Sequence, residues 1–166
     1  MSKTVNKSKA DIKEIVMNAA NKAIADGIFP ADAELPSFNV ETPADRQHGA
    51  YAVNAAMAWA KALRMPPVKI ADALVERFDL TDTYIDRCEI AGPGFLNFYL
   101  NDKYYADILL NIDEEGDDYG RSDYGQKKRV LIEFVSANPT GPMHIGNARG
   151  GAIGDCLASV MDFAGY

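Results

Sequence analysis

In the first half of the chain, segments with hydrophobic residues at helical spacing alternate with segments that have them at strand-like spacing. Gly27 ends a first helical run, and Ser8 is its candidate N-terminal cap, with Asp11 three residues on. Apolar side chains then recur at the spacing of one helix face: Ile12, Ile15, Val16, Ala19, Ala23 and Ile24. The pattern predicts a helix over residues 8–27.

The following residues predict a small sheet among further helices. Residues 35–42 read as a short strand between prolines, and residues 50–64 read as a helix after a turn at Gly49. A Pro-Pro pair starts the next helix. Residues 84–90 and 95–100 predict two antiparallel strands around Gly-Pro-Gly, before a helix that runs to about Asn111. Residues 1–112 therefore predict an α+β domain with a mainly antiparallel sheet.

A second domain is expected after an acidic, glycine-containing linker at residues 113–126. "KKRVLIEFVS" predicts a strand buried on both faces, "ANPTGPMH" a turn, and the residues from Ile145 a helix with a buried apolar stripe. Residues 127–166 thus predict the first βα unit of an incomplete Rossmann-like domain. We expect its unpaired segment to pack on the first domain, to pair with a second copy of the chain, or to move.

Composition narrows the class of protein. The chain is 48% hydrophobic and 25% charged, which is ordinary for a globular protein, and a net charge of −7 excludes nucleic-acid binding by bulk electrostatics. No run of 18 apolar residues and no signal peptide are visible, so we expect a cytoplasmic protein without a membrane span. Cys88 and Cys156 lie far apart in apolar segments and are expected to be buried thiols.

The turn before the last predicted helix has the residues of a phosphate site. A helix N-terminus favours anions, and Gly146, Gly150 and Gly151 allow a ligand to approach the backbone. His144 and Asn147 lie on one helical turn and can both donate hydrogen bonds to a phosphate that gains charge. The alternative is a buried turn in which the histidine only satisfies backbone groups.

Three stretches resemble one family, the arginyl-tRNA synthetases, which are class I enzymes with a HIGH motif. "EFVSANPTGPMHIGNARGGAIGDCLA" is similar to the family's signature region, where the usual string is close to A-N-P-T-G-P-L-H-V-G-H. "RQHGAYAVNAAMAWAKAL" resembles its H-G-D-Y-A-x-N segment, and "EIAGPGFLNFYL" the end of its N-terminal domain. Two departures stand out: Asn147 replaces the last histidine of HIGH, and Ala50 replaces the acid of H-G-D-Y.

The resemblance implies an enzyme that activates arginine with ATP and Mg²⁺ and then transfers it to tRNA-Arg. His144 and Asn147 would be the catalytic contacts to the ATP phosphates, and Gly146 would leave room for adenine and ribose. Glu133 would pair with the arginine guanidinium, although it could equally face solvent. The remaining site residues implied are Thr140, Gly141 and Pro142 for the ATP turn and Ser136 and Asn138 for arginine.

The same resemblance implies that the N-terminal domain contacts the D-loop of the tRNA. Tyr51 could stack on an exposed base, or Tyr51 and Asn54 could instead cap and pack a helix. His48 has the same two alternatives. The candidates for tRNA contact are Arg46, Gln47, His48, Tyr51 and Asn54. No metal site is expected, because the sequence has no Cys/His cluster.

Several features of the family are not found in these residues. No segment resembles a KMSKS loop, and one βα unit is only part of a nucleotide-binding domain. We therefore expect an N-terminal part of such an enzyme that is inactive by itself. The alternatives are a free-standing tRNA-binding or interaction module, and a fragment of another H-x-G-H nucleotidyltransferase.

Overall fold

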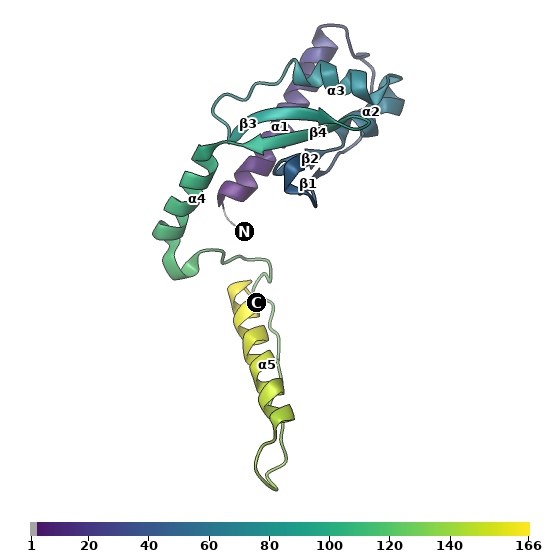
Figure 1. Ribbon diagram of the computed structural model, residues 1–166. Coiled ribbons are helices and arrows are strands. Elements are labelled where there is room, and N and C mark those ends of the chain that lie inside the picture. The colour runs from purple at the N-terminus through teal and green to yellow at the C-terminus, as the bar shows by residue number, and fades with distance from the viewer. Residues whose placement is uncertain (1–2) are drawn as a thin grey trace. The chain divides into compact units, whose positions relative to one another are not determined.

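The computed structural model describes residues 3–166, which form two compact units (Figure 1). The first comprises residues up to Asn111, and the second comprises Ile112–Tyr166. Each unit has its own internal contacts, and each is described by itself.

Helix α1, Lys3–Ala25, is longer than the sequence pattern predicts. Ser8 does not cap this helix, because the helix begins before it and Ser8 is fully buried within it. Its hydroxyl donates to the Val5 carbonyl at 2.9 Å, which is the local bond that a serine inside a helix commonly makes. Gly27 follows the helix with φ of +74°, a conformation that favours glycine, so the predicted end is confirmed.

The sheet of the first unit has four antiparallel strands in the order β1-β2-β4-β3. The predicted hairpin is confirmed as β3, Ile85–Ala91, and β4, Phe95–Leu100. The short strand expected at residues 35–42 is reduced to β1, Val40–Glu41. Strand β2, Tyr51–Val53, lies between β1 and β4.

The predicted helix over residues 50–64 is wrong at its start. Tyr51–Val53 pairs with β4 and forms β2, so helix α2 is confined to Ala55–Leu63. Apolar residues at 51 and 53 fit a strand as well as a helix, and only the partner strand decides between the two. Gly49 supports this arrangement, because a Cβ on it would lie 2.6 Å from the Phe98 carbonyl oxygen of β4.

Helices cover the sheet and complete one hydrophobic core. Helix α3, Pro67–Val75, contacts β3, helix α2 contacts β4, and α1 contacts both α3 and β1 (Figure 1). Trp59 is fully buried, and its indole N–H donates to the Pro36 carbonyl at 2.7 Å. Helix α4, Asp102–Glu115, extends beyond the predicted end at Asn111 into the expected linker, and the short 3₁₀ helix η2, Gly116–Asp118, follows it.

In the second unit the predicted helix is confirmed and the predicted strand is not. Helix α5 spans Ile145–Phe163, whereas residues 130–135 form no strand and Val135 has φ of +61°. A strand needs a neighbour for its backbone N–H and C=O groups, and among residues 112–166 no other strand is present. The segment instead contacts the helix through Phe134, which lies against Gly154.

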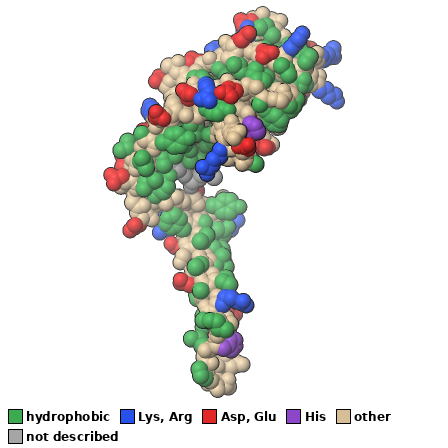
Figure 2. Space-filling view, viewed as in Figure 1, with side chains coloured by type: hydrophobic (Ala, Val, Ile, Leu, Met, Phe, Trp, Pro, Cys, Tyr) green, Lys and Arg blue, Asp and Glu red, His purple; other side chains and the backbone are tan. Residues whose placement is uncertain are grey.

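The apolar stripe of α5 is exposed rather than buried as expected. Ile153, Leu157 and Val160 are 62%, 47% and 65% exposed, and hydrophobic side chains follow this helix in the space-filling view (Figure 2). Cys156, on the same helix, is also exposed, so the expectation of a buried thiol is wrong for it. Within residues 3–166, no helix is both long and apolar enough to cross a membrane.

Candidate functional site

His144 is the N-cap of helix α5 and forms a reciprocal pair of hydrogen bonds with the first turn. Its Nδ1 accepts from the Gly146 N–H at 3.1 Å, and Asn147 Oδ1 accepts from the His144 N–H at 3.1 Å. This is a capping box in which an imidazole and an amide take the places of the usual hydroxyl and carboxylate. The two residues predicted to act together are therefore brought into contact.

Two nitrogen atoms of these side chains take no part in the capping box. The Nε2 of His144 and the Nδ2 of Asn147 are not the atoms that join the box. His144 is exposed and Asn147 is half-buried, at the positive end of a 19-residue helix. The arrangement can offer two N–H groups and a helix N-terminus to an anion.

Gly146 has a structural role in addition to the one predicted. A Cβ at this position would lie 2.9 Å from Cε1 and 3.0 Å from Nδ1 of His144. The missing side chain therefore makes room for the His144 ring over the helix end. At Gly150, by contrast, an added Cβ would have open space around it.

The candidate arginine-binding residues lie in the exposed segment before the turn. The Ser136 hydroxyl donates to Glu133 Oε1 at 2.6 Å, so these two side chains are coupled. Glu133, Ser136 and Asn138 are all exposed, as are the turn residues Thr140, Gly141 and Pro142. No group of three or more His, Cys, Asp or Glu side chains within residues 3–166 is arranged to hold a metal ion.

In the first unit, three of the tRNA-contact candidates lie together. Arg46–His48 forms the short 3₁₀ helix η1, which Asp45 caps by accepting from the Gln47 N–H at 2.9 Å. Arg46, Gln47 and His48 are all exposed. Gly49 ends the helix with φ of +83°.

Tyr51 is packed in the core, and Asn54 is the N-cap residue of α2, although its side chain makes no capping bond. Tyr51 is only 5% exposed, and its hydroxyl lies 3.1 Å from the buried Ser8 hydroxyl, so this side chain is packed in the core. Asn54 Oδ1 accepts from the Asn39 N–H at 3.2 Å and ties the start of α2 to the chain before β1.

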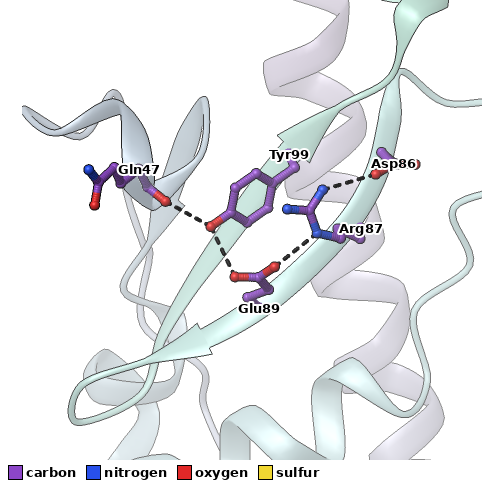
Figure 3. Close-up of polar contacts among 5 residues, drawn as sticks. All are labelled: Gln47, Asp86, Arg87, Glu89 and Tyr99. Carbon is purple, nitrogen blue, oxygen red and sulfur yellow. Dashed lines mark hydrogen bonds and ion pairs between the residues drawn. The ribbon is translucent and has the colours of Figure 1, made fainter.

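Beside η1, the sheet carries a polar network that the sequence analysis does not identify (Figure 3). The Tyr99 hydroxyl lies 2.9 Å from the Gln47 carbonyl oxygen and 3.0 Å from Glu89 Oε2. The Arg87 guanidinium bonds Glu89 and Asp86 and lies 3.9 Å from the centre of the Tyr99 ring. Hydrogen bonds from Arg87 and then Tyr99 lower the pKa of the Glu89 carboxyl, so it stays ionised.

The signal that locates this network is the register of the hairpin. The Gly-Pro-Gly turn joins Ala91 to Phe95, and counting back along both strands sets Arg87 opposite Tyr99, as observed. A cavity of about 550 Å³ adjoins the network. Its wall combines cationic and phenolic side chains, among them Arg46, Arg87, Tyr99 and Tyr105.

Comparisons with known proteins match both units. The profile of the arginyl tRNA synthetase N-terminal domain matches residues 10–100, and the profile of the catalytic domain of class I (R) tRNA synthetases matches residues 109–166. The arginine–tRNA ligase of Caldanaerobacter subterraneus subsp. tengcongensis is 47% identical over the whole chain. That of Acetivibrio thermocellus is 46% identical, also over the whole chain. The chain spans 29% of the length of each of these relatives.

A solved structure supports the fold. The arginyl-tRNA synthetase from Plasmodium falciparum superposes with a TM-score of 0.53 over 93% of this chain and 28% of its own length. The sequence identity is 22%, so this likeness concerns the fold alone.

Proposed function

This chain belongs to the arginyl-tRNA synthetase family, and on that premise we propose that it supplies the N-terminal domain and the ATP-phosphate turn of an arginine–tRNA ligase. Such an enzyme activates arginine with ATP and attaches it to tRNA-Arg in the cytoplasm. The observation that carries the proposal is the His144–Asn147 capping box at the start of α5, because it leaves two donors at the positive end of a helix.

In the proposed reaction, the arginine carboxylate attacks the α-phosphorus of ATP, and pyrophosphate leaves as arginyl-adenylate forms. Negative charge is redistributed over the phosphate oxygens during this step. His144 Nε2–H and the Asn147 amide donate hydrogen bonds to those oxygens, and neither has to transfer a proton. Thr140, Gly141 and Pro142 form the turn that precedes these donors, and Mg²⁺ accompanies ATP as in the family.

We assign the arginine side chain to Glu133. A carboxylate matches the planar guanidinium with two parallel hydrogen bonds. The bond from Ser136 to Glu133 Oε1 orients the carboxylate, and Asn138 lies on the same exposed segment, where it can meet the α-amino end of the substrate.

The N-terminal unit is proposed to contact the D-loop of tRNA-Arg through η1 and the adjoining cavity. Arg46 serves both features, because it is exposed in η1 and lines the cavity. Gln47 and His48 extend the polar surface, and Asn54 is a further proposed contact at the start of α2. Arg87 is already paired with Asp86 and Glu89, so Arg46 is the better cation for a phosphate.

The catalytic assignment is tested in a chimaera in which residues 1–166 replace the matching segment of the Caldanaerobacter relative. We expect arginine-dependent ATP–pyrophosphate exchange from the chimaera and none from the 166-residue chain. His144→Ala should lower the exchange rate roughly 10²–10³-fold, the usual cost of one transition-state donor. Ser159→Ala, exposed on the same helix, is the control. A folded chimaera in which His144→Ala exchanges normally contradicts the assignment.

The tRNA contact is tested on the 166-residue chain by gel-shift titration with tRNA-Arg and an unrelated tRNA. Selective binding is expected, and Arg46→Ala should weaken it about 3- to 10-fold, as expected for loss of one charged contact. Lys61→Ala removes an exposed cation from α2 and serves as the matched control. Equal binding of both tRNAs that is unchanged by Arg46→Ala would contradict this contact.

A monomer–dimer titration by analytical ultracentrifugation would test pairing of two chains through residues 127–166.

A further inference from the structure

The bond from Gly146 to His144 determines where the imidazole carries its proton. Nδ1 accepts from the Gly146 N–H at 3.1 Å, so Nδ1 cannot itself hold a hydrogen. A neutral imidazole has one N–H, which must then be at Nε2. The helix end thus selects one of two tautomers.

Two neighbouring residues favour this ring position. Asn147 Oδ1 accepts from the His144 N–H at 3.1 Å and fixes the backbone from which the ring projects. Gly146 has no Cβ, and an added one would lie 2.9 Å from Cε1 and 3.0 Å from Nδ1. These distances are shorter than, or at the limit of, ordinary contacts, so the ring could not stay where it is beside an alanine.

We propose that Gly146 and Asn147 are positioning residues that hold neutral His144 as its Nε2–H tautomer, so that Nε2–H is the donor offered to phosphate oxygens. The identity of the ligand rests on the proposed function, but the tautomer does not. It follows that His144 in this state is a fixed hydrogen-bond donor. It cannot act as a base through Nδ1, whose lone pair is occupied.

The same geometry gives a reason for asparagine at the fourth position of the motif. The capping box needs an acceptor for the His144 N–H, and the carbonyl of an amide accepts at every pH. A histidine at that position would also accept when neutral, but it would lose its acceptor on protonation, because an imidazolium only donates. Asn147 combines the acceptor Oδ1 with the donor Nδ2 in one side chain.

The test uses ¹⁵N-histidine NMR on the 166-residue chain at about pH 8, above the ordinary titration range of imidazole. The chain has only two histidines, and the exposed His48 serves as the internal reference. For His144 we expect a pyridine-like Nδ1 shift and a pyrrole-like Nε2 shift. In uniformly labelled protein, a scalar coupling across the hydrogen bond should join the Gly146 amide nitrogen to His144 Nδ1.

Matched variants separate positioning from simple helix stability. Gly146→Ala should abolish the coupling and move the His144 shifts toward the tautomer average of His48, while α5 keeps its helical amide shifts. Gly150→Ala changes the same residue type where there is open space and should leave both signals unchanged. Asn147→Ala should weaken the coupling, and Asn147→Asp, which keeps the acceptor oxygen, should restore it.

A protonated Nδ1 or an absent coupling in the unsubstituted chain would overturn the inference, and so would an unchanged signal in Gly146→Ala. None of these results depends on ATP. Failure of the chimaera to exchange pyrophosphate, with the tautomer confirmed, would reject the proposed ligand and leave the positioning role intact.

Discussion

The roles of several single residues in this protein are set by the atoms that lie close to them. Gly49 lies where a Cβ would meet the Phe98 carbonyl, and Gly146 lies where one would meet the His144 ring. Tyr51 shows the opposite case, because its side chain is buried and its hydroxyl lies beside that of Ser8. In each case a specific neighbour, rather than the residue type, decides the role.

Gly49→Ala should destabilise the first unit by about 2–4 kcal/mol. The alanine would have to keep a positive φ, and its Cβ would lie 2.6 Å from the Phe98 carbonyl oxygen of β4. Gly27→Ala is the control, since its φ of +74° is similar but its surroundings are open, and about 1 kcal/mol is expected. Urea unfolding followed by fluorescence of the single tryptophan, Trp59, measures both. Equal losses in the two variants would mean that the approach to β4 has no energetic weight.

The two cysteines should differ sharply in reactivity. Burial, with a smaller contribution from Glu89, raises the pKa of Cys88 to about 12, so at pH 8 only about one molecule in 10⁴ is the reactive thiolate. Cys156 is exposed and should react with a maleimide at least about 100-fold faster, as measured by mass spectrometry of the labelled peptides. Comparable rates in the folded protein would contradict this burial, whereas similar rates in urea are expected.

At the level of elements, hydrophobic periodicity predicts whether a helix or strand forms better than it predicts where that element begins and ends. The helices and the β3–β4 hairpin are where the pattern puts them, but β2 occupies the predicted start of a helix. Residues 130–135 have the composition of a buried strand and yet form none, because the described part of their unit provides no neighbouring strand. They contact α5 instead, at its glycines.

Gly154→Ala should separate this segment from α5, because the added Cβ would overlap the Phe134 ring. We expect the amides of residues 130–136 to exchange with solvent several-fold faster, while the helix itself gains propensity. Hydrogen exchange followed by mass spectrometry measures this, with Gly150→Ala as the control that adds the same methyl group without a collision. Unchanged exchange in Gly154→Ala would show that the contact does not order the segment.

For the whole molecule, the hydrophobic core lies entirely within the first unit. Its buried cluster runs from Ile12 to Phe98, whereas in the second unit large apolar side chains are exposed. An independent first unit follows, since burial of apolar surface is the main source of folding free energy.

A chain of residues 1–115, which retains all of α4, should therefore fold by itself. Its free energy of unfolding, followed by Trp59 fluorescence in urea, should match that of the 166-residue chain within about 0.5 kcal/mol. Loss of the cooperative transition in residues 1–115 would mean that residues 116–166 contribute to the core. Limited proteolysis, expected to cut after residue 115, is an independent check.

The family, the α+β class of the first unit, most helices, and the pairing of His144 with Asn147 can all be predicted from the order of the amino acids. These properties depend on short-range order, because helix periodicity, turn residues and motif spacing act within a few residues of one another. A hairpin belongs to the same group, since its tight turn sets the register.

Contacts between distant parts of the chain set the burial of Tyr51, the identity of β2 as a strand, and the assembly of Gln47, Glu89 and Tyr99 into one network. The space that Gly146 leaves for the His144 ring depends on the direction of one side chain. Each of these properties depends on contacts between residues far apart in the sequence, or on the rotamer of a neighbouring side chain. Local patterns do not encode those contacts, because the same pattern fits more than one partner.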